Sequence, residues 1–158
     1  MMARIGITGH ARLAGDTSSL VYKALTTELR RYTGGKLHGI TCLCDGVDQI
    51  FARAVIERGG DLAVVLPADD YRERLVDRDD FDRLLGKAAQ VSRMPFRHSD
   101  RQAYKAASEE VLRRCDLLLA VWDGMPSREV GDTADVVATA WKDGVPVVVL
   151  WPAGARRA

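Results

Sequence analysis

The sequence predicts a single three-layer α/β domain of the Rossmann-like type, with a doubly wound parallel sheet of about five strands. Apolar runs rich in β-branched residues alternate along its 158 residues with segments whose apolar residues recur at helical spacing. The runs stop at Gly, Asp or Pro, as buried parallel strands do where they open onto loops. This alternation builds a parallel sheet covered by helices on both faces, and the length fits one such domain.

The first half of the chain contains three expected strands and two expected helices. Leu20, Leu25 and Leu29 share one face of the first helix, which Gly34 and Gly35 end. The expected elements are a strand at Ala3–Thr8, a helix at Thr17–Tyr32, a strand at Leu37–Cys44, a helix at Val47–Glu57 and a strand at Asp61–Leu66.

The segment Ala68–Phe96 differs from the rest because it carries many aspartates and arginines. We expect a loop, a short helix near Asp80–Ala89 and a short strand or extended piece at Val91–Pro95. The charged run indicates a solvated face, and a lid over the site is the alternative.

The remainder resumes the alternation and ends in a polar tail. The domain is expected to span residues 1–153, with Gly154–Ala158 frayed and Trp141 in the core. The expected elements are a helix at Gln102–Arg114, a strand at Asp116–Val121, a helix at Thr133–Lys142 and a strand at Val145–Leu150.

Composition excludes some partners. The net charge is +1, so no global field favours nucleic acid or a membrane. The sequence contains neither an apolar run long enough to cross a bilayer nor a signal peptide, so we expect a cytoplasmic protein. Cys42, Cys44 and Cys115 lack metal or redox spacing and are expected to be reduced thiols.

Ligands of open parallel sheets bind beyond the carboxyl ends of the strands, where the strand order reverses. After the first strand, Thr8, Gly9 and His10 combine a close backbone approach with two hydrogen-bonding side chains. Arg12 suits a phosphate or a carboxylate. A plain turn with a solvated arginine is the alternative interpretation.

After the second strand, Asp45, Gly46 and Asp48 precede or begin a helix. Asp45 or Gly46 can cap this helix, and Asp48 can favour its dipole by about 0.3–1 kcal/mol. An aspartate at this place can also accept ribose hydroxyls.

The strongest local pattern follows the strand that ends at Val121. Gly131 and the helix-start amides can hold an anion, and the Thr133 hydroxyl can assist. A capped helix after a flexible loop is the alternative interpretation. The other expected binding residues here are Trp122, Asp123, Gly124 and Asp132. Trp122 and Trp151 can stack on a planar base or pack at the edge of the core.

Several common sites are absent from the sequence. It has no Gly-x-Gly-x-x-Gly, no P-loop, no His/Cys cluster with metal spacing and no Gly-x-Ser-x-Gly elbow. We therefore expect no metal and no bound cofactor.

The segments Ile5–His10, Thr41–Asp48, Cys115–Gly124 and Gly131–Asp135 resemble the SLOG superfamily, over nearly the whole chain. The resemblance implies a Rossmann-like domain that binds nucleotides or nucleotide-derived signals. This superfamily includes the LOG-type phosphoribohydrolases, whose loop reads Pro-Gly-Gly-x-Gly-Thr-x-Glu-Glu.

In that comparison, Gly131, Thr133 and Asp135 match the last glycine, the threonine and the first glutamate. Ser127–Val130 replaces the proline and the glycine pair, and the LOG arginine is missing near Ala107. These departures weigh against phosphoribohydrolase activity and leave nucleotide binding untouched.

Two functions follow as hypotheses. The first is a sensing or binding domain for a nucleotide or nucleotide-derived small molecule. The alternative is an N-glycosidic hydrolase or transferase acting on nucleoside monophosphates, with Asp135 and Asp48 as the catalytic carboxylates. Binding of nucleic acid, as in the DNA-processing members of the superfamily, is disfavoured by the near-neutral charge. A homodimer is consistent with the resemblance.

Overall fold

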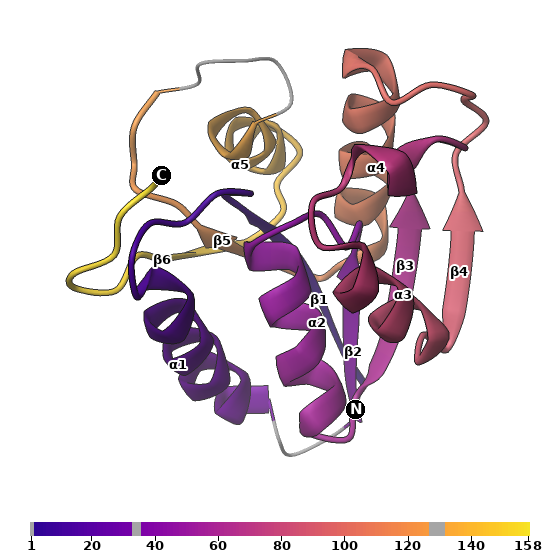
Figure 1. Ribbon diagram of the computed structural model, residues 1–158. Coiled ribbons are helices and arrows are strands. Elements are labelled where there is room, and N and C mark those ends of the chain that lie inside the picture. The colour runs from indigo at the N-terminus through magenta and orange to yellow at the C-terminus, as the bar shows by residue number, and fades with distance from the viewer. Residues whose placement is uncertain (1, 33–35, 127–131) are drawn as a thin grey trace.

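A computed structural model describes residues 2–32, 36–126 and 132–158 and shows a parallel sheet with helices on both faces (Figure 1). The strands are β1 (Met2–Gly9), β2 (Lys36–Thr41), β3 (Asp61–Leu66), β4 (Gln90–Arg93), β5 (Leu117–Val121) and β6 (Val147–Leu150). The helices are α1 (Thr17–Leu29), α2 (Val47–Glu57), α3 (Arg78–Gly86), α4 (Arg101–Arg114) and α5 (Thr133–Lys142), with 3-10 turns η1 (Arg30–Tyr32) and η2 (Tyr71–Arg74).

The sheet order is β4-β3-β2-β1-β5-β6, and every described strand pair is parallel. The chain winds outward from β1 to β4, then crosses back to place β5 on the other side of β1. The strand order therefore reverses between β1 and β5. This confirms the doubly wound α/β fold, with six strands in the described residues rather than about five, because Gln90–Arg93 pairs with β3.

The core lies in two layers. On one face, Leu25 of α1 and Phe51 of α2 pack against Ile5 and Leu119 of the sheet. On the other face, α4 and α5 cover residues such as Leu118. Each fully buried side chain of this size contributes roughly 1.5–3 kcal/mol, so the two layers account for most of the hydrophobic stabilisation.

The charged segment after β3 is amphipathic. Tyr71, Leu75, Phe81 and Leu84 are buried against α2 and β3, while charged neighbours such as Arg72 face solvent. This arrangement agrees with a solvated face. The described helix starts at Arg78, earlier than expected, because the Asp77 carboxylate accepts a hydrogen bond from the Asp80 amide and caps it.

Two strands are shorter than expected for local reasons. β2 ends at Thr41 instead of Cys44, because Leu43 adopts a left-handed φ of 56° and its amide donates to Thr41 Oγ1. β6 begins at Val147 instead of Val145, because Pro146 has no amide hydrogen to donate. The prediction that Trp141 lies in the core is wrong, since 59% of this residue is exposed. Its position in α5 faces outward from the apolar stripe.

The final residues pair with the β1–α1 loop, which differs from the expectation that Gly154–Ala158 frays. The Ala14 amide donates to the Arg156 carbonyl at 2.9 Å, and the Ala158 amide donates to the Arg12 carbonyl at 3.2 Å. The Arg156 amide donates to Thr17 Oγ1 at 2.9 Å. A polar composition does not reveal such backbone partners, which come from a segment far away in sequence.

Two glycines allow the β1–α1 loop to lie against the start of α2. A Cβ at Gly9 would lie 2.4 Å from Val47 Cγ1. Gly46 has a φ of 79°, and a Cβ there would lie 2.5 Å from the Ala11 carbonyl oxygen. The Val47 amide donates to the His10 carbonyl at 3.3 Å, so the loop caps the helix with its own backbone.

Gly46→Ala is expected to lower the free energy of unfolding by about 2–5 kcal/mol, because left-handed strain and overpacking add. Gly59→Ala is the control: its φ is 77°, and nothing lies within 4 Å of a Cβ there. Gly59→Ala should lower the free energy of unfolding by about 1–2 kcal/mol, from backbone strain alone. Urea unfolding measures both values, and equal losses would contradict the role of close approach at Gly46.

Candidate functional site

The carboxyl ends of β1 and β5 lie side by side, with Gly9 opposite Val121 in the register. This is the point of strand-order reversal, where ligands of doubly wound sheets bind. We call the region the switch-point surface. It consists of residues 8–16, which end β1 and form the loop after it, and residues 122–126, which follow β5 (Figure 1). It also includes residues 132–135 at the start of α5 and the tail 154–158.

An ionic group joins three parts of this surface. His10 Nε2 lies 3.7 Å from Asp123 Oδ1, and Arg157 Nη1 lies 3.4 Å from Asp123 Oδ2. The His10 and Asp123 side chains are 7% and 15% exposed, so water screens their interaction only partly. The group therefore holds the β1–α1 loop, the β5–α5 loop and the tail together.

The Asp123 carboxylate remains ionised under ordinary conditions. Burial by itself would raise the pKa of Asp123, but the Met125 amide hydrogen bond and the charges of His10 and Arg157 outweigh it. The net pKa therefore lies below its usual value. This carboxylate is an acceptor, not a proton donor, at neutral pH.

The two tryptophans of the site lie in different surroundings. The Trp151 ring meets the His10 ring edge-on, with 5.5 Å between centroids. Trp122 Nε1 donates to the Met125 carbonyl at 3.0 Å, and its ring contacts Trp141 at 6.2 Å. Trp151 thus borders the ionic group, whereas the Trp122 ring packs on α5.

The Asp132 side chain caps the start of α5. Asp132 Oδ1 accepts a hydrogen bond from the Asp135 amide at 3.3 Å, and Thr133 is buried. An anion approaching this helix start would meet the Asp132 carboxylate, which works against phosphate binding there. Gly131 lies outside the described residues. Gly124 is exposed with a φ of 81°, as a turn residue.

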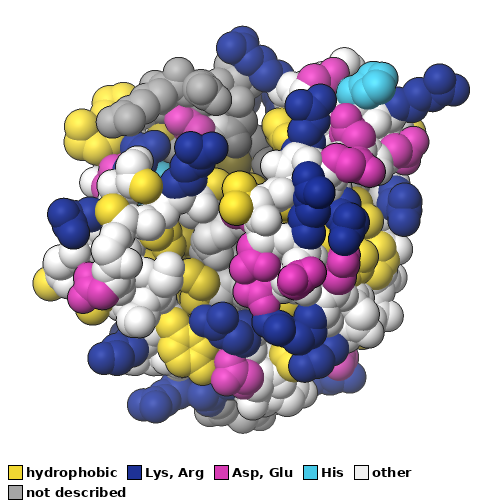
Figure 2. Space-filling view, viewed as in Figure 1, with side chains coloured by type: hydrophobic (Ala, Val, Ile, Leu, Met, Phe, Trp, Pro, Cys, Tyr) yellow, Lys and Arg dark blue, Asp and Glu magenta, His cyan; other side chains and the backbone are white. Residues whose placement is uncertain are grey.

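Positive charge at the switch-point surface comes from the loop and the tail. Leu13 and Arg157 form an antiparallel bridge, so Arg12 and Arg156 project from the opposite face of this two-stranded ribbon, diagonal to each other. Both are exposed. Sequence reasoning found Arg12 but missed Arg156 and Arg157, since only the Arg-Arg pair in the tail hinted at them. Elsewhere on the face in Figure 2, acidic and basic side chains are interspersed.

The aspartates after β2 have other partners. Both Asp45 carboxylate oxygens accept backbone hydrogen bonds, from Val76 at 2.9 Å and from Asp77 at 3.0 Å. Asp45 therefore anchors the segment that precedes α3. Thr8 is nearly buried at the end of β1, opposite Ala120.

Asp48 is a buried carboxyl group in the first turn of α2. Its Oδ2 accepts from the Cys44 amide at 3.3 Å. Burial raises the pKa of Asp48 to about 7, although hydrogen bonds from Cys44, Thr41 and Cys42 act in the opposite direction. Burial also raises the pKa of Cys44 to about 12, so this thiol stays protonated and unreactive.

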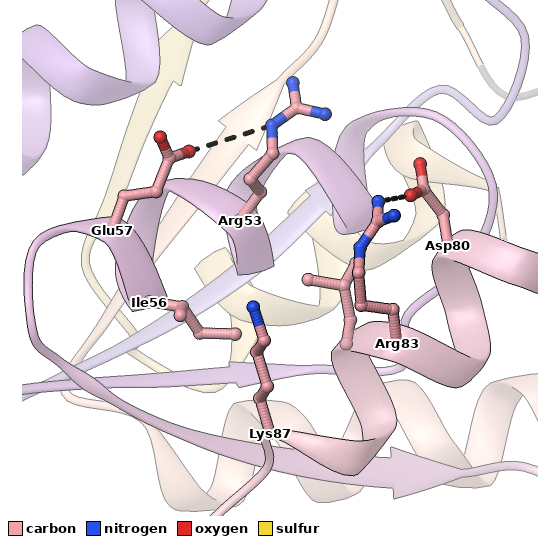
Figure 3. A pocket seen from close by; sticks show the side chains of 7 residues that line it. Arg53, Ile56, Glu57, Asp80, Arg83 and Lys87 are labelled. Carbon is pink, nitrogen blue, oxygen red and sulfur yellow. Dashed lines mark ion pairs between the residues drawn. The ribbon is translucent and has the colours of Figure 1, made fainter.

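Two surface grooves lie away from the switch point. One, of about 280 Å³, lies between α2 and α3, and Figure 3 shows its charged side chains. Arg53 pairs with Glu57 and Arg83 pairs with Asp80 inside it, so the charges largely compensate one another. The other, of about 380 Å³, lies between α1 and Pro152. Neither groove brings together the polar residues expected from the sequence.

Within residues 2–32, 36–126 and 132–158, no group of three or more His, Cys, Asp or Glu side chains is placed to hold a metal ion. No helix in the same part of the chain is both long and apolar enough to cross a membrane.

No protein-family model and no curated protein sequence matches the chain. Solved structures do. DNA processing protein A of Streptococcus pneumoniae aligns with 94% of this chain and 50% of its own, at 13% identity and a TM-score of 0.67. The same protein of Helicobacter pylori, which binds single-stranded DNA, aligns over 93% of this chain and 64% of its own, at 14% identity and a TM-score of 0.63.

The molybdenum cofactor binding protein of Rippkaea orientalis aligns over 94% of this chain and 76% of its own, at 18% identity and a TM-score of 0.60. The chain has the fold of these proteins. This is the Rossmann-like fold that the SLOG resemblance implies. The chain spans about half the length of the Streptococcus DNA processing protein A.

The buried Asp48 predicts a pH-dependent stability. Its pKa of about 7 lies above the value of 3.8 for an exposed carboxyl, so the folded state binds the proton more tightly. The free energy of unfolding should therefore fall as the pH rises, by on the order of 3 kcal/mol between about pH 5 and pH 8. Urea unfolding across this range measures the decline.

Asp48→Asn should remove most of this decline. Asp61→Asn is the control, because it removes a carboxylate at the start of β3, at the amino end of the strands. It should leave the decline in stability in place. A wild-type protein with equal stability at both ends of the range would show that Asp48 is ionised throughout.

Proposed function

We propose that the chain binds a nucleotide or a nucleotide-derived small molecule at the switch-point surface. The observation that carries the proposal is the grouping of His10, Asp123 and Trp151 where the strand order reverses, with the exposed Arg12 and Arg156 on the adjoining loop and tail. Guanidinium groups suit phosphate, and an indole ring offers a face or an edge to a planar base. Neighbours of this fold that bind single-stranded DNA or the molybdenum cofactor support a ligand-binding role.

The charges favour one orientation of such a ligand. The phosphate lies towards Arg12 and Arg156, because the start of α5 carries Asp132 and Asp135. The sugar lies towards these aspartates, whose oxygens accept hydroxyl hydrogen bonds. The base lies near Trp151. This arrangement reverses the expectation that the start of α5 holds the phosphate.

N-glycosidic hydrolysis is the second candidate function. It is supported by Asp135, which lies partly buried in the first turn of α5 beside the expected sugar position. A carboxylate there can stabilise an oxocarbenium-like charge. Asp48 contributes less to this candidate, because it is buried against Cys44.

Nucleoside monophosphates are expected to stabilise the protein by about 2.7 kcal/mol at a hundredfold excess over the dissociation constant, as measured by thermal unfolding. Arg12→Ala and Arg156→Ala should each weaken binding by about tenfold or more in calorimetry, since each removes a charge-assisted hydrogen bond. Arg58→Ala is the matched control, because Arg58 is an exposed arginine at the end of α2.

If neither arginine variant changes the affinity, the proposed phosphate position is wrong. If no nucleoside phosphate stabilises the protein, and a short single-stranded oligonucleotide does, the ligand is a nucleic acid and the small-molecule proposal fails.

Release of free base separates the two candidate functions. A binding domain should leave nucleoside monophosphates intact over hours, as chromatography of the mixture shows. Turnover that Asp135→Asn reduces by about a hundredfold or more, with binding retained, would instead establish the hydrolase.

A further inference from the structure

The tail reaches the switch-point surface through a tight turn after β6. The Ala155 amide donates to the Pro152 carbonyl at 3.0 Å, and Gly154, the third residue of this turn, has a φ of 87°. Glycine is favoured there because a side chain strains a left-handed backbone. The turn therefore sets the direction in which the chain leaves Trp151 and returns to the β1–α1 loop (Figure 1).

The contacts that attach the tail are polar. Hydrogen bonds of the Ala14, Arg156 and Ala158 amides join it to the β1–α1 loop and the start of α1. An ion pair joins Arg157 to Asp123. In the described part of the chain, no residue of the tail belongs to an apolar core cluster. A segment with few buried apolar contacts opens locally at a much lower free energy than the core, so the tail can detach while the fold stays intact.

The β1–α1 loop has attachments of its own. Leu13 packs against the core layer between the sheet and α1, and the His10 carbonyl accepts from the Val47 amide. The backbone of the loop therefore stays in place when the tail detaches. Detachment removes one guanidinium from beside Asp123 and a second, that of Arg156, from the surface. The surface thus loses positive charge without unfolding.

We propose that attachment of the tail and binding of a nucleotide at the switch-point surface are coupled, so that the bound nucleotide holds the tail in place. The phosphate is attracted most strongly when both tail arginines are at the surface, so the attached form binds it more tightly. A ligand that prefers one of two forms shifts the population towards that form, and by the same factor the attached tail strengthens binding. The inference rests on the proposed function, because it requires an anion at this surface.

Hydrogen exchange of the Ala14 and Ala158 amides in the whole chain measures attachment, because both amides donate across the contact. Without nucleotide, Gly154→Ala should speed the exchange of both amides by about tenfold, because alanine strains the turn of the attached tail and not the detached chain. Gly59→Ala is the matched control, since Gly59 also has a left-handed φ, of 77°, but follows α2. It should leave both exchange rates unchanged.

A panel of the four ribonucleoside 5′-monophosphates tests the coupling. Any of them that binds should slow the exchange of the Ala14 and Ala158 amides by about tenfold or more, in the wild type and in Gly154→Ala. The Gly60 amide, which donates to the Val55 carbonyl at the far end of α2, should exchange at an unchanged rate.

Three results would overturn the proposal in different ways. Equal exchange in the wild type and Gly154→Ala would show that the turn does not hold the tail. A nucleotide that binds in calorimetry without slowing exchange would disprove the coupling and leave the proposed function standing. If none of the four binds the wild type, the proposed function fails and the coupling fails with it.

Discussion

The approach of the His10–Ala11 backbone to Gly46 constrains everything at the switch-point surface. The carbonyl of His10 accepts from the first amide of α2, and no side chain fits between the loop and the helix. This contact fixes the path of the chain as it leaves β1. Because the backbone of His10 is fixed, its ring is held between Asp123 and Trp151, and the tail can align beside Leu13.

Charge is distributed unevenly around the region thus assembled. The start of α5 contributes carboxylates, whereas the β1–α1 loop and the tail contribute guanidinium groups. Doubly wound sheets usually favour an anion at a helix start, but the Asp132 cap places negative charge there instead. The chemistry of this surface therefore depends on two segments that flank the sheet, more than on the helix dipole.

Much of the fold follows from the sequence, because apolar periodicity reports directly on burial. The alternation around Ile5, Leu25 and Phe51 predicts the layers, and the strand ends predict where β1 and β5 meet. Local backbone geometry was harder to predict: the left-handed Leu43 leaves no pattern in the sequence, whereas Pro146 could have marked the later start of β6. Periodicity also placed Trp141 in the core, although its position in α5 faces outward from the apolar stripe.

The sequence predicts which loops carry the residues of the candidate site, but not which groups these residues bind. Thr8, His10, Arg12 and Asp123 were expected at the sheet edge and lie there. The Asp45 carboxylate binds the amides before α3, and the sequence did not predict these partners because they are about thirty residues away. Arg156 and Arg157 could not be placed, because their position depends on an antiparallel pairing between two short irregular segments.

The pairing of the tail with the β1–α1 loop has a practical consequence for handling this protein. The start of β1 lies at the amino end of the strands, whereas the tail lies at their carboxyl end (Figure 1). Residues fused after Ala158 would emerge next to Arg12. A polyhistidine or acidic extension there would alter the electrostatic environment of the very surface under study, whereas the same extension before β1 would leave it undisturbed.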